Sequence, residues 1–289
     1  MAAANMKAVK LRIKSVQNTM QITKAMQLVA ASKLRRAKEK AEQSRPYYET
    51  LRAALERIAS ENTEFCSRYV RCSGSDKWLY IVIAGDRGLA GGYNANIFKR
   101  MEEEAAGKDY AVLPVGRKSV DYYSRKGVPI LSEQFADVSS VGASDCFEIS
   151  RQVCEEYSKG NYGHVCLCFT RFVSMMTQTP EITAVLPLSD FRKSTEGGNG
   201  QEKAKNLILY EPDSETVFDS IVPDYLAGIL YTGINVSVAS ELAARRTAME
   251  AATDNAEEMI ETLSLNYNRA RQASITQEIT EIVAGAEET

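Results

Sequence analysis

The N-terminal segment constrains the fold most, because it predicts a single helix much longer than a compact domain. Residues 6–60 contain no glycine and one proline, Pro46, and they are rich in Ala, Lys, Arg, Gln, Glu, Met and Leu, which are good helix formers. At 1.5 Å per residue such a helix would measure roughly 80 Å. Pro46 is expected to bend the helix or break it locally.

The C-terminal segment predicts a second helix of similar length, from about Asp224 to Ala284. Gly228 and Gly233 weaken its first turns by up to about 1 kcal/mol each, so its beginning is less well defined than its end near Gly285. The chain is therefore divided into an N-terminal coiled-coil helix (1–60), an inserted domain (61–213) and a C-terminal coiled-coil helix (214–289).

Both helices carry apolar and small residues at steps of three and four, the pattern of a coiled-coil seam. Because a domain is inserted between the helices, antiparallel pairing is the simplest arrangement. The seam of the first helix is predicted at Ile13, Val16, Met20, Thr23, Gln27, Ala30, Leu34, Ala37, Ala41, Ser44, Tyr48, Leu51, Leu55 and Ile58, and that of the second at Met249, Ala252, Ala256, Met259, Leu263 and Ala270.

Between the helices, short β-rich runs alternate with helical ones, which predicts a mostly parallel, doubly wound, Rossmann-like α/β domain. Residues 193–205 are polar and rich in glycine, and we expect a mobile surface loop there. The predicted strands are 77–84, 110–116, 164–173 and 181–188, and the predicted helices are 97–106, 118–126 and 145–159.

Residues 22–31 of the first helix are apolar on nearly every side, so one partner helix cannot cover them all. Leaving Ile22, Met26, Leu28 or Val29 in water forfeits about 1.5 to 3 kcal/mol each. Either the chain's own domain buries this segment or other polypeptides enclose it. We favour an external sleeve, because burial in the domain would shorten the seam.

Charge and composition narrow the class of partner. The net charge of −3 gives no global attraction to nucleic acid, but the first helix is strongly basic, which favours an acidic protein surface as its partner. The sequence shows no secretory signal and no run of ~20 apolar residues that a membrane span requires, so no span is expected. The six cysteines are expected to be free thiols.

A glycine-rich turn at 84–94 could in principle cradle a phosphate, but it lacks the Lys-Ser/Thr of a P-loop and the glycine spacing of a dinucleotide site. A tight turn requiring positive φ explains it equally well. His164 opens an apolar strand without companion metal ligands, and Cys166 and Cys168 suit a packed core. We therefore predict no catalytic residue, no metal and no cofactor, with nucleotide binding by the turn and nucleic-acid binding by the basic helix kept as alternatives.

Three stretches resemble the γ-subunit family of F-type ATP synthases, and the resemblance runs from end to end of the chain. They are residues 15–33, beginning Ser-Val-Gln-Asn-Thr-Met, the turn at 85–94, and residues 268–283, beginning Asn-Arg-Ala-Arg-Gln-Ala-Ser. The first and last lie on the two predicted long helices. The resemblance implies a central-stalk rotor that couples ion translocation to ATP synthesis and is not itself catalytic.

The resemblance also implies partners and contact residues. The terminal helices would lie inside a ring of three α and three β subunits, and the inserted domain would lie beside ε and the c-ring. The implied contacts are Lys24, Met26 and Lys33 with an acidic loop of β, Arg271, Gln272 and Thr276 at the tip held by the ring, and Tyr210, Glu211 and Asp213 near the c-ring.

The overall match is of the bacterial type, which implies a peripheral protein at the cytoplasmic face of the plasma membrane. The regulatory insertion of the chloroplast type is absent. Cys66 and Cys72 precede the first predicted strand, so a redox role for them is doubtful. The resemblance leaves open whether the coupling ion is a proton or sodium.

Overall fold

Helix α1 (Ala2–Glu61) continues through Pro46, so of the bend or local break expected there, the break does not occur. The computed structural model describes residues 2–61, 66–70, 74–189 and 209–287. Pro46 and Glu42, whose carbonyl group loses its helical donor, are both exposed, so water can hydrate that carbonyl. The predicted loop at 193–205 lies outside the described residues.

Helix α6 (Ser214–Glu287) begins earlier than the expected Asp224 and continues through Pro223 and both of its early glycines. Asp213 caps its first turn, because one carboxylate oxygen accepts a hydrogen bond from the Thr216 backbone N–H at 2.7 Å. One apolar window of this helix is long enough to cross a membrane, but 72% of that window is buried inside the protein.

A four-stranded sheet forms the centre of the inserted domain, with the strand order β2-β1-β3-β4. Strand β1 pairs in parallel with β2 and β3, and β4 pairs with β3 in antiparallel orientation. This mixed sheet confirms the predicted α/β class. The strands are β1 (Trp78–Ile83), β2 (Tyr110–Val115), β3 (His164–Phe172) and β4 (Gln178–Leu186).

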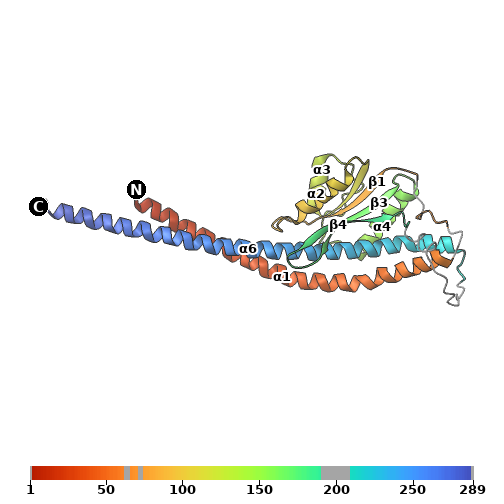
Figure 1. The fold of residues 1–289 in the computed structure, drawn as a ribbon, viewed down its shortest axis with the longest axis horizontal. Coiled ribbons are helices and arrows are strands. Elements are labelled where there is room, and N and C mark those ends of the chain that lie inside the picture. The colour runs from red at the N-terminus through yellow and green to blue at the C-terminus, as the bar shows by residue number, and fades with distance from the viewer. Residues whose placement is uncertain (1, 62–65, 71–73, 190–208, 288–289) are drawn as a thin grey trace. The chain divides into compact units, whose positions relative to one another are not determined.

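Helices cover both faces of the sheet (Figure 1). On one face, α2 (Tyr93–Ala105) and α3 (Arg117–Lys126) cover Tyr80 and Val82 of β1. On the other, α4 (Ala143–Ser158), α1 and α6 enclose Leu79, Ile81 and Ile83. The alternation along β1 therefore sends successive side chains into two separate cores.

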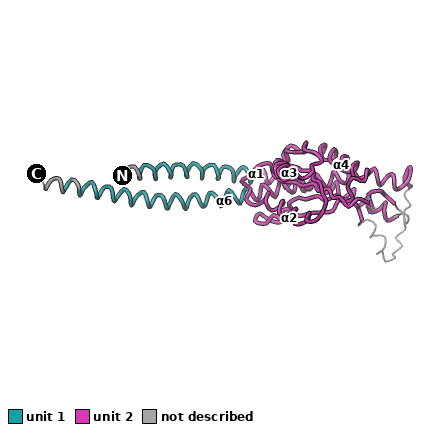
Figure 2. The backbone as a smooth tube through the Cα atoms, turned by 90° about the horizontal axis from the view of Figure 1, so that it is seen from above, with its two compact units in different colours: residues 1–32, 245–289 teal, residues 33–244 magenta. Residues whose placement is uncertain are grey.

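The chain divides into two compact units, shown in different colours in Figure 2. Unit 1 comprises residues 1–32 and 245–289, and unit 2 comprises residues 33–244. In unit 1 the two helical segments run antiparallel, with both chain termini at the same end. In unit 2 the Ser44 hydroxyl hydrogen-bonds that of Thr232 at 3.1 Å, and Tyr48 contacts Gly228, which again is antiparallel.

Candidate interaction surface

Unit 1 exposes an unusual amount of apolar surface. Soluble monomers expose such side chains singly, whereas contiguous patches mark interaction sites. Here exposed side chains recur along both helices and are not confined to one end of the unit. The large hydrophobic residues concerned are Leu11, Ile22, Leu28, Val29, Met259, Leu265, Ile275, Ile279, Ile282 and Val283.

Three large side chains of the apolar segment at 22–31 are exposed in unit 1. Ile22 is 60% exposed, Leu28 66% and Val29 55%, whereas Ala30 and Thr23 are buried against the other helix. Met26 is half-buried. Pairing of the two helices in unit 1 therefore leaves part of this apolar segment uncovered.

The seam of unit 1 is narrow and contains hydroxyl groups. The hydroxyls of Thr23 and Thr253 lie 2.8 Å apart in a buried hydrogen bond, and that of Thr253 also donates to the Met249 carbonyl at 2.8 Å. Ala30 and Ala256 are buried on the same seam. Small side chains let the helices approach closely, but they bury little apolar area.

The predicted seam positions on α1 are all buried or half-buried, which confirms the periodicity read from the sequence. On α6 the prediction of Met259 is wrong, because this side chain is 45% exposed. The neighbouring Ile260 is half-buried instead. The predicted seam also omits Thr253, which lies four residues after Met249 and therefore at the right spacing. It was missed because its side chain is polar.

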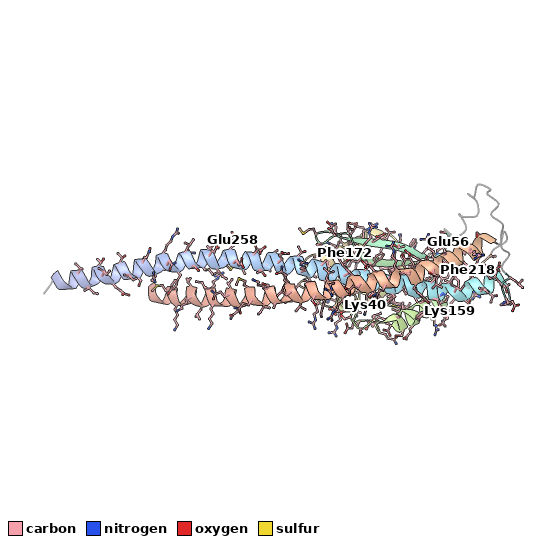
Figure 3. The ribbon with its side chains drawn as sticks, turned by 90° about the horizontal axis from the view of Figure 1, so that it is seen from below. Lys40, Glu56, Lys159, Phe172, Phe218 and Glu258 are labelled. Atoms are coloured by element: carbon pink, nitrogen blue, oxygen red, sulfur yellow. The ribbon has the colours of Figure 1, made fainter. Side chains whose placement is uncertain are left out.

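The two helices of unit 1 differ in charge. Residues 1–32 contain no Asp or Glu, and Lys7, Lys10, Arg12, Lys14 and Lys24 are exposed. The α6 segment carries exposed acidic residues instead, among them Glu258, whose side chain points away from the helix pair (Figure 3). The α1 side of unit 1 therefore offers a positively charged surface beside the exposed apolar residues.

The residues predicted at the tip lie on the last turns of α6. Arg271, Gln272 and Thr276 are all exposed, and the Thr276 hydroxyl donates to the Gln272 carbonyl at 2.9 Å. The adjacent Ile275 and Ile279 are exposed as well, and the sequence analysis missed both. Their spacing of four, continued by Val283, is the signal that could have identified them.

The remaining predicted contact residues lie in or beside unit 2. Lys33 and Glu211 are exposed, and Tyr210 is half-buried against the main core. The pKa of the Asp213 carboxyl is lowered, first by the Thr216 backbone N–H and then by the Thr216 hydroxyl. Asp213 therefore has a structural role as a helix cap, whatever partner it contacts.

The glycine-rich turn has a structural explanation. Gly91 has φ of 56° and Leu89 φ of 64°, so the turn does require the left-handed region. The Asp86 carboxylate accepts hydrogen bonds from the backbone N–H groups of Val138 at 3.0 Å and Ser139 at 3.3 Å, which ties the turn to a neighbouring loop. An acidic group at this position repels a phosphate.

The single histidine and the strand cysteines are packed, as predicted. His164 stacks on Trp78 with ring centroids 4.3 Å apart. Burial raises the pKa of the Cys166 thiol to about 12, which keeps it protonated and unreactive. All five cysteines in the described part of the chain are free, with Cys66 exposed, and Cys72 lies outside that part.

Comparison with known proteins places the chain in a family. The ATP synthase family model matches residues 5–288. The ATP synthase gamma chain of Ruminococcus albus is 45% identical over 284 residues, covering 96% of each chain. The chain belongs to the ATP synthase gamma chain family. As a gamma chain family member it is a non-catalytic subunit and a component of the central stalk.

Other gamma chains agree with this assignment. The sodium-ion-specific ATP synthase gamma chain of Acetobacterium woodii is 40% identical and covers 99% of each chain. A chain of the Euglena gracilis mitochondrial ATP synthase, in a structure of its OSCP, F1 and c-ring, has a TM-score of 0.69 at 19% identity, covering 99% of this chain and 94% of that one. The structural likeness supports the fold of the gamma chain family.

Proposed function

We propose that this gamma chain family member transmits rotation of a c-ring to a catalytic ring of α and β subunits, and so couples ion translocation to ATP synthesis. The observation that carries the proposal is the exposed apolar surface of unit 1. Covering its ten large side chains, which are about half exposed, would regain roughly 1 kcal/mol each. A total of about 10 kcal/mol is comparable with the stability of a whole domain.

The charge of α1 supports a specific orientation in the ring. An acidic loop of β would face the basic side of unit 1, where Lys24 is exposed and Met26 is half-buried. Arg271, Gln272 and Thr276 would contact the ring at the other helix, because all three are exposed on α6. Exposed charges at such an interface fix orientation more than they add affinity.

The surface that we propose to face ε and the c-ring lies in or beside unit 2. Glu211 and Asp213 are exposed beside the half-buried Tyr210 and would face ε and the c-ring, together with the start of α6. In this role the chain would be a peripheral protein at the cytoplasmic face of the bacterial plasma membrane.

Isolation of the assembled complex tests the proposal directly. The full chain, carrying an internal tag in unit 2, is purified from membranes, and its partners are identified by mass spectrometry. We expect α, β, ε and the c-subunit to co-purify. Recovery of the chain without α and β would contradict the proposed role. ATP-driven uptake of protons and of sodium into vesicles then identifies the coupling ion.

The substitution Met26→Lys tests the contact with the ring. Met26 is half-buried, and a lysine stem can cover apolar surface while its ammonium group stays in water, so the change should cost the free chain no more than about 1 kcal/mol. In the assembled complex the new lysine would place another cation against the acidic loop of β. This change at the contact should lower the ratio of ion pumping to ATP hydrolysis. Met26→Leu is the matched control, and an unchanged ratio for Met26→Lys would argue against the assigned contact.

A further inference from the structure

A cavity of about 440 Å³ lies within unit 2, between helix α1, strand β3 and helix α6. Small-molecule sites in proteins usually measure roughly 300–1,000 Å³, so the cavity is large enough for one. All of its lining residues fall between 33 and 244 and therefore belong to a single compact unit. The residues proposed to contact the ring, ε or the c-ring do not line it.

Aromatic side chains form much of the wall of this cavity. Tyr48 and Phe169 pack against the main core of unit 2, whereas Phe172 packs against a separate small cluster on α1 and α6. The cavity is lined by side chains from both groups, so it lies between them. Ala41 and Ala239 also line it, and their small side chains leave the space unfilled.

Positive charge surrounds the aromatic wall. The charged lining residues are Lys38, Glu42 and Arg45 of α1 and Arg171 of β3, which are three cations and one carboxylate, a net charge of +2. The Lys38 ammonium group lies 4.1 Å from the centroid of the Phe172 ring. Among the described residues, Lys38 makes this contact and no ion pair. Its charge is therefore available to an anion in the cavity.

The two arginines can also bind a further anion. Arg45 contacts Glu49 through its Nε at 2.8 Å, and Arg171 contacts Glu181 through its Nε at 3.2 Å. A guanidinium group carries five N–H donors, which is more than one carboxylate uses. All four side chains are at least 39% exposed, and exposed ion pairs contribute little to stability. A ligand can therefore share either guanidinium group with its glutamate.

We propose that this cavity binds a small aromatic carboxylate. The ring of the ligand packs against Phe169 and Phe172, and its carboxylate faces Lys38 and the two arginines, which are the donors that bind carboxylates most strongly. Because the lining comes from α1, β3 and α6, the bound ligand bridges the two helices and the sheet. The inference concerns unit 2 alone and does not depend on the proposed partners of the chain.

Titration of the full chain with naphthalene-2-carboxylate, followed by ligand-observed NMR, tests the proposal. Lys38→Gln removes the charge beside Phe172 and should weaken binding about tenfold. Lys40→Gln is the matched control, because Lys40 is exposed on the same helix and does not line the cavity. Equal affinities of the two variants, or no saturable binding by the natural chain, would overturn the proposal.

A neutral ligand of the same shape separates the role of charge from that of apolar contact. Naphthalene-2-methanol keeps the ring system and lacks the carboxylate, so it should bind the natural chain about tenfold more weakly. Lys38→Gln should not weaken its binding further. If the acid and the alcohol bound equally well, the cations would not recognise the ligand and the proposal would fail.

The location of binding is measured separately, because unit 1 also exposes apolar side chains. The photoreactive aromatic carboxylate 4-benzoylbenzoate is irradiated with the full natural chain, and the labelled peptides are identified by mass spectrometry. We expect labelling within residues 38–48 or 169–172, reduced by an excess of naphthalene-2-carboxylate. Labelling confined to residues 1–32 and 245–289 would show that the ligand binds unit 1, against the proposal.

Discussion

The hydrogen bond between Thr23 and Thr253 shows how single residues fix the register of unit 1. A seam of alanines would allow many pairings of similar energy, whereas a buried hydroxyl pair allows one. The two residues are separated by 230 positions in the sequence, and their hydroxyls are 2.8 Å apart. In unit 1, therefore, polar residues specify the register of the two helices, and apolar residues hold the helices together.

A double-mutant cycle with Thr23→Val and Thr253→Val measures this hydrogen bond. Each single change removes one partner of a buried pair and should lower the free energy of unfolding of unit 1 by about 1 kcal/mol. The double variant should be more stable than the sum of the single losses implies, because either single change already removes the bond between the two hydroxyls. Thermal unfolding of the full chain gives the measurement, and strict additivity would show that the pair does not interact.

The helices show which sequence signals were sufficient to predict the fold. Steps of three and four predicted the α1 seam correctly, because burial in a helix pair follows the helical repeat. Of the bend or local break predicted at Pro46, the break did not occur, because the residue lies on the exposed side of α1. The cavity between α1, β3 and α6 could not be predicted, since its lining joins residues far apart in sequence and Lys38 resembles any other helical lysine.

The cap of α6 gives a pH-dependent prediction. The pKa of Asp213 is lowered in the folded chain, so its contribution to stability is present above the unfolded value of about 3.9 and is lost as the pH falls through the folded pKa. Asp213→Asn keeps a capping oxygen but cannot titrate. We expect the Thr216 amide resonance to shift below pH 4 in the natural chain only. A shift of equal size in the variant would exclude Asp213 as its cause.

At the scale of the whole molecule, the two units differ in what holds them together. Unit 2 has a sheet with helices on both faces, whereas the described part of unit 1 is a helix pair with a narrow seam. Few buried apolar contacts imply a low free energy of local opening. Unit 1 of the free chain should therefore open more often than unit 2.

Limited trypsin digestion tests this difference. In the free chain, cleavage after the exposed Lys10, Lys14 and Lys24 of unit 1 should precede cleavage after the exposed Lys99 and Lys159 of unit 2. In the assembled complex the unit 1 sites should be protected. Mass spectrometry of timed samples gives the order, and equal rates in both units of the free chain would refute the predicted difference.

The wide sequence separation of Thr23 and Thr253 also has a consequence for biosynthesis. The ribosome makes the helical segment that contains Thr23 at the start of translation, and the segment that contains Thr253 only near the end. Throughout the intervening period Ala30, which the other helix buries in the folded chain, is exposed together with Ile22, Leu28 and Val29, and transiently exposed apolar surface promotes aggregation. We therefore expect the N-terminal segment to bind chaperones that act before chain release.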